Sequence, residues 1–411
     1  EYTFTPTKTP DPDICAGGND TTIVIWVNPT PRVRVTASDT VLCDGDPVTL
    51  QLRNPNVPIR GIWDGTLEIT VDPGITGVTS QTIPFSGDAV YNYTLNNTSD
   101  EARSVTYHFM PRIRDDDGDW CNNGIDTTIV VWVNPVPDIL VVASDTLICN
   151  EEVADIKVSS LKPYVRGEWY YELEVTPDPE ITGARVGSIY PIDSISIQDQ
   201  LINTDTAVHK VVYRFIPRIG PSDFDGDCEN GRDTTVTIWV NPTPRIFVGF
   251  PDTIFCNNDT AVISVDDGLG VVYGAKEYTV TAVYGPGVNV ISRSSGSIET
   301  LPAGTPITDI YINNTLEAQP VDYTFTPRIR DVREGYLGNY CYDGAITIRI
   351  WIHPTPDIQV SVADTIICDN SLVEIDVTSA QGGITGGSLV YDLVVTYDPV
   401  NVSGTITGSG E

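Results

Sequence analysis

Eight cysteines are the residues best suited to chemistry in this sequence, and their spacing favours disulfide bonds. None of them forms the Cys-x-x-Cys pair that zinc sites and redox sites use. An even number of cysteines at recurring stations instead predicts disulfides in an oxidising compartment. The eight are Cys15, Cys43, Cys121, Cys149, Cys228, Cys256, Cys341 and Cys368.

Three pairing schemes fit the period of these cysteines: within a repeat (Cys43 with Cys121), across a linker (Cys121 with Cys149), or forward (Cys43 with Cys228 and Cys149 with Cys341). In the expected topology, the two cysteines of one repeat lie at opposite ends of a strand. Eight strand residues span about 26 Å, whereas a disulfide needs about 6 Å between Cα atoms. This argues against pairing within a repeat. We favour the forward pairs Cys43–Cys228 and Cys149–Cys341, which would join successive repeats.

Two acidic loops alternate carboxylates around a glycine, and such oxygen atoms are the ligands that calcium prefers. The loops lack the bidentate glutamate of an EF-hand, and the corresponding loop at 331–335 breaks the pattern. A solvated acidic turn is therefore the preferred interpretation, with a calcium site as the alternative. The candidate ligands are Asp115, Asp117, Asp119, Asp223, Asp225 and Asp227.

Catalytic chemistry has no comparable set of residues in the sequence. His108, His209 and His353 lie in different repeats, and no nucleophile elbow, metal-ligand cluster or phosphate loop accompanies them. We therefore expect a protein that is not an enzyme and has no cofactor, calcium being possible.

Repeats are the elements that must position the cysteines. A Trp-Val-Asn-Pro tract begins at Trp26, Trp132 and Trp239, and a variant begins at Trp351, which gives a period of about 107 residues. Short β-branched runs are separated every eight to twelve residues by Gly, Pro, Asn or Asp, and helical periodicity is absent. This predicts an all-β chain of tandem immunoglobulin-like Greek-key β-sandwich domains stacked end to end.

The repeat boundaries follow from the Trp tract. We expect the sequence to begin and end inside a repeat, so that three full repeats lie between two fragments. In the middle repeat, strands are expected near 138–144, 153–159, 169–176, 184–190, 195–201, 208–217 and 234–240. The expected domains are a C-terminal fragment at 1–29, the first repeat at 30–135, the middle repeat at 136–242, the third repeat at 243–354 and an N-terminal fragment at 355–411.

The Asn-Pro-x-Pro links between repeats are short and stiff, because each proline fixes a backbone torsion and holds the residue before it extended. Successive sandwiches should therefore stack as a rod. The repeated Trp132, Trp239 and Trp351 could be platforms for sugars, but their alternation with aliphatic residues favours packing at or near the core.

The net charge of −33 repels phosphate backbones and anionic lipids. No apolar run approaches the length of a membrane helix. We therefore expect neither nucleic acid binding nor membrane contact in this segment. The expected partners are other copies of the protein, through head-to-tail or lateral association, and surface glycans or a substratum contacted through regions outside this chain.

Three motifs carry a family resemblance: Trp-Val-Asn-Pro-Thr-Pro-Arg at 26–32, Ser-Asp-Thr-Val-Leu-Cys at 38–43 and Phe-x-Pro-Arg-Ile-Arg-Asp at 109–115, the last followed by a Cys loop. The whole chain resembles the tandem PKD-like or immunoglobulin-like repeats of giant Bacteroidetes cell-surface adhesins, including gliding-motility adhesins. The resemblance implies export by the type 9 secretion route, an extracellular location attached to the cell surface, and a role in adhesion, motility or filaments.

A recurring Asp-Thr or Asp-Ser pair has two interpretations. Its side chains can bond the local backbone at turns and strand entries. It also resembles the O-glycosylation acceptor of exported Bacteroidetes proteins, which implies a glycoprotein. The candidate acceptors are Thr21, Thr40, Thr127, Thr146, Ser194, Thr206, Thr234, Thr253, Thr260 and Thr365.

Taken together, these features favour a structural stalk or rod segment of a long extracellular adhesin or filament, which gives mechanical reach and surface attachment. The alternative is an array of carbohydrate-binding modules or the spacer of a secreted polysaccharide-acting protein.

Overall fold

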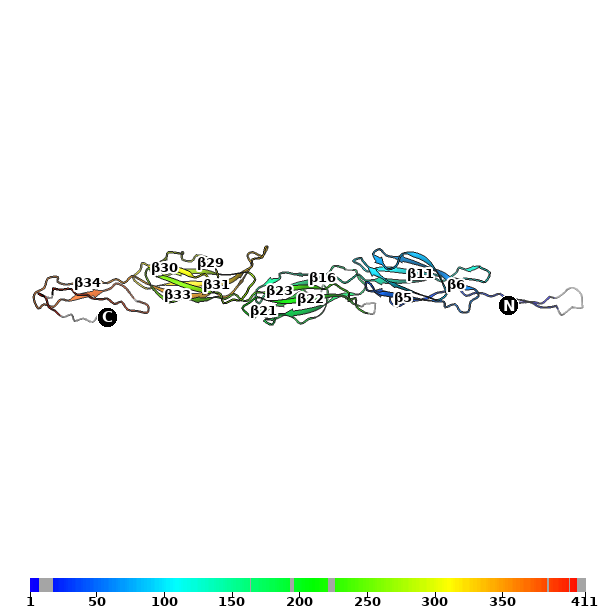
Figure 1. Cartoon of the computed structure of the whole chain (residues 1–411), viewed down its shortest axis with the longest axis horizontal. Coiled ribbons are helices and arrows are strands. Elements are labelled where there is room, and N and C mark those ends of the chain that lie inside the picture. The colour runs from blue at the N-terminus through cyan, green and yellow to red at the C-terminus, as the bar shows by residue number, and fades with distance from the viewer. Residues whose placement is uncertain are drawn as a thin grey trace.

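The computed structural model describes residues 1–6, 18–162, 164–192, 196–220, 226–382, 384–398 and 400–404. β-sheet modules follow one another in a row along a single axis (Figure 1). Three separate hydrophobic clusters lie within 33–133, 139–240 and 246–352, one in each full repeat. The fold is therefore a tandem array of immunoglobulin-like sandwiches, as the sequence predicts.

Two facing sheets build the middle repeat. One contains β14 (Ile139–Ala143), β16 (Val153–Ser160) and β20 (Ile197–Gln200), and the other contains β15 (Leu147–Ile148), β23 (Thr234–Val240), β22 (His209–Gly220), β17 (Glu168–Pro177) and β19 (Ser188–Pro191). Each of the seven segments expected as a strand overlaps one of these. The sequence did not predict that the chain crosses between the sheets after β14, so that β15 pairs in parallel with β23.

The first and third repeats have the same two sheets. In the first repeat these are β3 (Arg34–Ala37), β5 (Pro47–Arg53) and β9 (Ala89–Thr94), facing β4 (Val41–Leu42), β13 (Thr127–Val133), β11 (Arg103–Arg114), β6 (Ile62–Val71) and β8 (Gln81–Ser86), with β12 (Trp120–Cys121) beside β11. In the third they are β24 (Phe247–Gly249), β26 (Thr260–Asp266), β30 (Ile307–Asn313) and β28 (Val288–Val290), facing β25 (Ile254–Cys256), β33 (Ile346–His353), β31 (Gln319–Arg330), β27 (Ala275–Tyr284) and β29 (Ile298–Pro302), with β32 (Tyr340–Tyr342) beside β31.

Small two-stranded ribbons complete the structure. β7 (Ile75–Thr76) pairs with β10 (Asn96–Asn97), and β18 (Ile181–Thr182) pairs with β21 (Ile202–Asn203). In the two end segments, β1 (Tyr2–Phe4) pairs with β2 (Thr21–Ile23), and β34 (Gln359–Val362) pairs with β35 (Ile375–Thr378).

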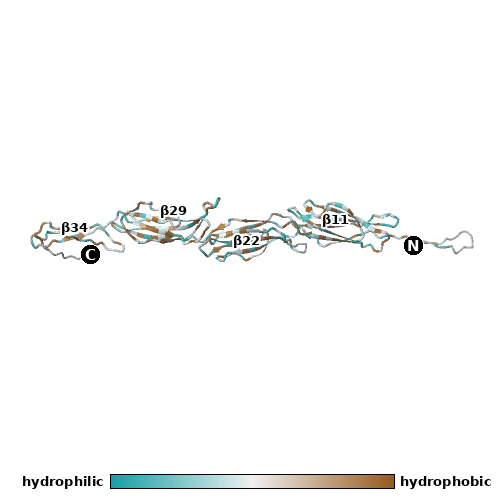
Figure 2. Ribbon diagram, in the orientation of Figure 1, coloured by the Kyte–Doolittle hydropathy of each residue, from teal (hydrophilic) through white to brown (hydrophobic). Residues whose placement is uncertain are grey.

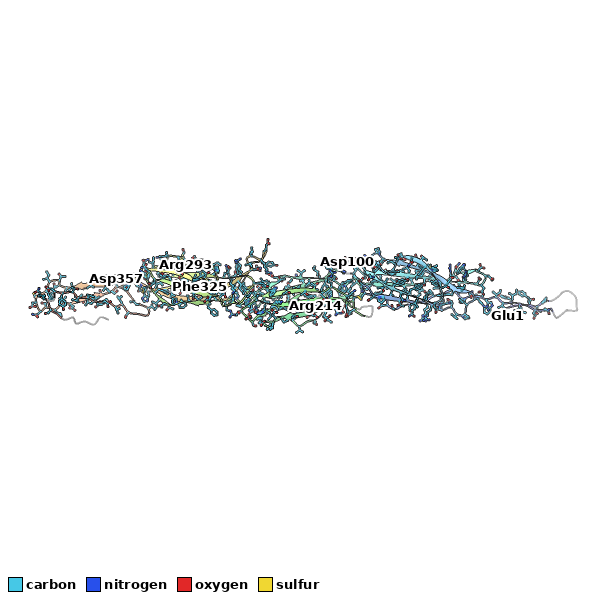
Figure 3. All side chains as sticks on the ribbon, viewed as in Figure 1. Glu1, Asp100, Arg214, Arg293, Phe325 and Asp357 are labelled. Atoms are coloured by element: carbon cyan, nitrogen blue, oxygen red, sulfur yellow. A yellow bond between two sulfur atoms is a disulfide. The ribbon has the colours of Figure 1, made fainter. Side chains whose placement is uncertain are left out.

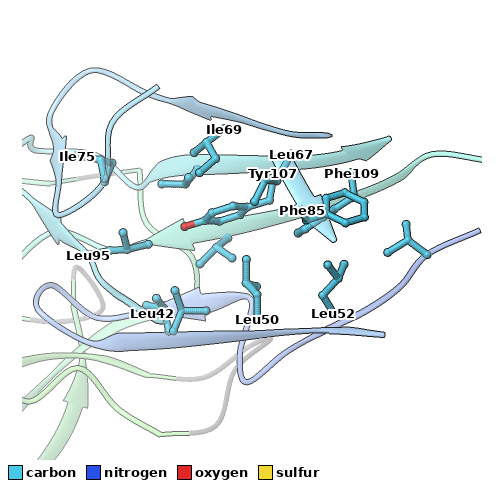
Figure 4. Close-up of a cluster of buried hydrophobic side chains, with 14 of the residues drawn as sticks. Leu42, Leu50, Leu52, Leu67, Ile69, Ile75, Phe85, Leu95, Tyr107 and Phe109 are labelled. Atoms are coloured by element: carbon cyan, nitrogen blue, oxygen red, sulfur yellow. The ribbon is translucent and has the colours of Figure 1, made fainter. Parts of the chain in front are cut away.

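Alternation along the strands produces the core. Side chains on a strand point to opposite faces in turn, so β5 and β11 bury every second residue. The hydropathy of the chain changes residue by residue along such strands (Figure 2). In the first repeat, Leu50 and Leu52 face Leu67, Tyr107 and Phe109 across the space between the sheets (Figure 4). Each repeat thus has an apolar interior of its own.

A buried polar network distinguishes the third repeat from the first. Asp309 is fully buried and accepts hydrogen bonds from the Tyr323 hydroxyl and, at 2.8 Å, from Arg293 Nε. The middle repeat repeats the arrangement around Asp199. The first repeat has Tyr93 at this station, stacked 5.5 Å from Tyr107, and the buried Tyr107 hydroxyl has no hydrogen-bond partner among the described residues.

Removing the two tyrosine hydroxyls should therefore have opposite consequences. Tyr323→Phe deprives Asp309 of a donor and should destabilise the third repeat by about 1–3 kcal/mol. Tyr107→Phe removes an unpartnered buried hydroxyl and should leave the first repeat as stable or more stable. Hydrogen exchange of the full chain, resolved by peptide, measures both. Equal loss of protection in the two variants would contradict this account.

The joints between repeats as the candidate functional site

An asparagine of the Asn-Pro-x-Pro link clamps each repeat to the next. After β23, Asn241 Nδ2 donates to Tyr273 O at 2.8 Å, and Tyr273 N donates to Asn241 Oδ1 at 2.9 Å. The side-chain amide thus imitates a backbone pairing with the following repeat. The same two bonds join Asn134 to Arg166 and Asn28 to Arg60, and at the variant link His353 Nε2 lies 3.0 Å from Thr385 O.

The tryptophan two residues before each clamp asparagine belongs to the joint and not to the core. The Arg166 guanidinium lies 3.9 Å from the centre of the Trp132 ring, and Tyr273 meets Trp239 edge-on at 4.8 Å. The expectation of packing at or near the core is corrected here. Val131 and Val133 are buried, so strand alternation turns Trp132 to the opposite face, where the next repeat covers it.

Turns at the facing ends make further contacts. Gly270 N donates to Thr206 O at 3.0 Å, and Val208 N donates to Val271 O at 2.8 Å, between the third and middle repeats. The joint before it contains the corresponding bond from Ala102 N to Tyr164 O. Asp100, at the end of the first repeat (Figure 3), has a carboxylate oxygen 3.7 Å from Lys162 Nζ of the middle repeat.

Disulfides close the same joints. Cys43 is bonded to Cys228 and Cys149 to Cys341, with Cα–Cα distances of 5.3 and 5.4 Å. Each bond links the turn that follows the first strands of one repeat to the loop that precedes the last strand of the next. These are the two forward pairs favoured from the sequence. Cys121, Cys256 and Cys368 carry free thiols, and Cys15 lies outside the described residues.

The Pro-Arg-Ile motif positions the loop cysteine. Ile329 pairs with Cys341 across β31 and β32, as Ile113 pairs with Cys121 in the first repeat. Arg328 anchors the loop from the side, because its Nε donates to Glu277 Oε1 at 2.7 Å and its guanidinium lies 4.4 Å from the centre of the Tyr340 ring. Arg112, Asp64 and Trp120 repeat this anchor.

A carboxylate three residues later holds the turn cysteine. Glu152 accepts a hydrogen bond from Cys149 N at 2.9 Å, and the turn passes through Glu151 at a φ of 68°. The corresponding carboxylates are Asp46, which bonds Cys43 N, and Asp259, which bonds Cys256 N. Hydrogen bonds within its own repeat therefore hold the cysteine of this turn.

Three buried asparagines, whose role the sequence pattern did not predict, brace the joints from inside each repeat. Asn203 Nδ2 donates to Ala207 O and Val240 O at 2.8 and 2.9 Å, and Asn203 N donates to Asn150 Oδ1. Asn150 in turn donates to Thr243 Oγ1 at 2.7 Å in the link. The recurrence of Asn97, Asn203 and Asn313 at one station was the signal that could have revealed this network.

Arg333 adds an ion pair to the joint between the middle and third repeats. Its Nη2 lies 2.9 Å from Asp145 of the middle repeat and 2.6 Å from Asp331. The hydrogen bond from Arg333 lowers the pKa of Asp331. A cleft of about 350 Å³ lies beside this pair, with Cys149 and Cys341 in its wall.

The first acidic loop is organised as a turn. Asp115 Oδ1 accepts the N–H groups of Asp117 and Asp119 at 3.1 and 2.8 Å. Within the described residues, no three His, Cys, Asp or Glu side chains are grouped so that they could hold a metal ion. Asp227 is exposed, and Asp223 and Asp225 lie outside the described residues.

Three of the Asp-Thr pairs mark the point where the chain changes sheet. Asp39, Asp145 and Asp252 each accept the N–H of the residue two positions on, at 3.1, 2.9 and 3.1 Å. This is the local turn role expected from the sequence. Ser194 lies outside the described residues. Of the remaining candidate acceptors, Thr21, Thr40, Thr146, Thr253, Thr260 and Thr365 are exposed, and Thr127, Thr206 and Thr234 are half-buried.

Solved structures match the chain at low identity and low TM-score. Among solved structures, the chain is similar to FdeC, an Escherichia coli adhesin, with 12% identity and a TM-score of 0.36 over 80% of this chain and 99% of that one. Three N-terminal domains of the outer capsid protein Hoc of bacteriophage RB49 have 11% identity and a TM-score of 0.36, over 79% of this chain and 100% of that one. The Yersinia pseudotuberculosis adhesin InvE has 15% identity and a TM-score of 0.24, over 52% of this chain and 60% of that one.

Sequence families give one match. No curated protein matches the chain. The part of the chain that the structure describes has no helix long and apolar enough to cross a membrane.

Residues 147–244 match the PKD-like domain family. The middle member of this row of immunoglobulin-like sandwiches is therefore similar to a PKD-like domain.

Proposed function

We propose that this chain is a stalk segment of a long extracellular adhesin or filament, which holds a binding region away from the surface that carries it. The observation that carries the proposal is the double closure of each joint between full repeats. A disulfide spans the joint on one side, and the asparagine clamp fixes the link itself. Two attachments at separate points resist bending more than a single link does.

Other features are consistent with this role. Disulfides persist in oxidising compartments, which suits a protein displayed outside the cell. The net charge of −33 keeps neighbouring stalks apart and soluble. The proposal includes attachment to the cell surface, export by the type 9 route and glycosylation at the exposed Asp-Thr sites. It includes no catalytic activity.

The runner-up is an array of carbohydrate-binding modules. Sugar binding by stacking needs an open aromatic face, but Arg166 lies over the Trp132 ring and Lys210 Nζ lies 5.4 Å from the centre of the Trp239 ring. The stalk proposal therefore stands first. Binding of the chain to a glycan array would favour the modules instead.

Small-angle scattering tests the stalk directly. The oxidised chain should scatter as an extended rod. Asn134→Ala with Asn241→Ala removes both clamps and should broaden the distance distribution, and reduction of the disulfides in this variant should broaden it further. Asn289→Ala, at an exposed asparagine of the third repeat, is the matched control and should change nothing. A wild-type chain that scatters as flexibly linked beads would refute the proposal.

A further inference from the structure

His209 lies at the end of the middle repeat that faces the third, with a carboxylate group on each side of its ring. Its Nε2 lies 2.9 Å from Asp205 Oδ2, whereas its Nδ1 lies 3.3 Å from Glu180 and 3.5 Å from Asp178. A neutral imidazole donates from one nitrogen only, and the imidazolium ion donates from both. The arrangement therefore suits the protonated ring.

The three carboxylates accompany histidine in this repeat alone. The first repeat has Arg103 at the station of His209, with Asp72, Gly74 and Ser99 at the stations of the carboxylates. The third repeat has Gln319 there, and its corresponding residues are Gly285, Gly287 and Thr315. The cation is thus permanent in the first repeat, titratable in the middle one and absent from the third.

No second cation lies at the His209 ring among the residues that the structure describes. On the neighbouring strand β23, His209 pairs with the apolar Val240. Lys210, the adjacent residue on β22, has its Nζ 5.4 Å from the centre of the Trp239 ring. The loop of the third repeat that reaches this end presents Gly270 and Val271. The charged groups facing His209 are therefore Asp178, Glu180 and Asp205.

The turn held by His209 makes backbone hydrogen bonds to the third repeat. Asp205 begins the turn whose Thr206 O accepts Gly270 N and whose Val208 N donates to Val271 O. We propose that His209 is a proton-operated latch: when protonated it pins this turn to the turn that carries Asp178 and Glu180, and its deprotonation loosens the joint between the middle and third repeats. This goes beyond the stalk role, because it makes one joint of the row respond to pH.

The direction of the effect follows from the proton balance. The hydrogen bond to Asp205 raises the pKa of His209 above its ordinary value. The latch is therefore complete at a pH below about 6.5, the ordinary pKa of histidine, and is lost as the pH rises through the higher folded value.

Hydrogen exchange of the Gly270 and Val208 amides in the oxidised full chain tests the latch. His209→Arg copies the first repeat and is the reference at each pH, because exchange itself depends on pH. Protection in the wild type should equal that of His209→Arg at pH 5, where the ring is protonated, and fall below it at pH 9, where the ring is neutral. His209→Gln copies the third repeat, and its Gly270 and Val208 amides should be less protected than those of His209→Arg at both pH values.

Two results would overturn the latch: wild-type protection that follows His209→Arg throughout, or His209→Gln protection equal to the wild type at pH 5. His108→Gln is the matched control, since His108 also lies near carboxylates, Glu68 and Asp126, but on β11 away from this joint. It should keep the wild-type response. Small-angle scattering of the wild-type chain at pH 5 tests the stalk proposal separately. A rod-like chain at this pH supports the stalk whether or not His209 acts as a latch.

Discussion

Pulled from its two ends, the oxidised chain will extend far less than the reduced chain. The disulfides interleave along the sequence, Cys43–Cys228 closing a loop of 185 residues and Cys149–Cys341 one of 192. At about 3.5 Å per extended residue, a loop of that size stores about 650 Å of chain that unfolding cannot release while the bond is intact.

Single-molecule force spectroscopy measures this difference. A variant with Cys149→Ser and Cys341→Ser keeps only the loop closed by Cys43–Cys228, and its free thiols are blocked before the measurement. Its full extension should be about 650 Å shorter than that of the reduced chain. The control is the same variant after reduction, which should recover the full length. Equal extension of the oxidised and reduced wild type would show that the joints are not covalently closed.

The largest effect on folding stability is expected from Asp309→Ala. Asp309 is fully buried and pairs with Arg293, whose side chain is itself only 10% exposed. Loss of the carboxylate leaves a buried guanidinium without its main partner and also removes the acceptor of the Tyr323 hydroxyl. Breaking one side of a buried ion pair costs about 3–5 kcal/mol, which should fall on the third repeat.

Peptide-resolved hydrogen exchange locates this loss. Peptides from 243–354 should lose protection, and those from the first repeat should not change. Asp322→Ala is the matched control, because Asp322 pairs with Arg349 at the exposed surface of the same repeat, where an ion pair contributes little. If the two variants lose the same stability, the buried network does not support the third repeat.

Local patterns in the sequence were enough to predict the strands that form the sheets. Alternation in segments such as 153–159 and 208–217 predicts β16 and β22 with small errors at the ends. The period of the cysteines and the length of a strand were enough to favour the pairs that the structure contains. These inferences need only distances along one strand or one repeat.

Contacts between repeats could not be predicted from such local patterns. Asn241 reads as a link residue, and nothing in its neighbours indicates that its amide pairs with Tyr273, 32 residues later. Trp239 alternates with apolar residues whether it faces the core or the next repeat, so only the packed structure separates the two. The switch from β14 to β15 has a local signal, Asp145, but the same Asp-Thr pair occurs at other kinds of turn.

The parallel pairing of β15 with β23 determines how the middle repeat bears load. Tension transmitted through Cys228 pulls on the chain just before β23, toward the first repeat, whereas tension through Cys149 pulls on the end of β15, toward the third. The two strands are then drawn past each other lengthwise. Their hydrogen bonds, from Trp239 N to Thr146 O and from Asn241 N to Ile148 O, must then shear together instead of opening one at a time, so that both share the load.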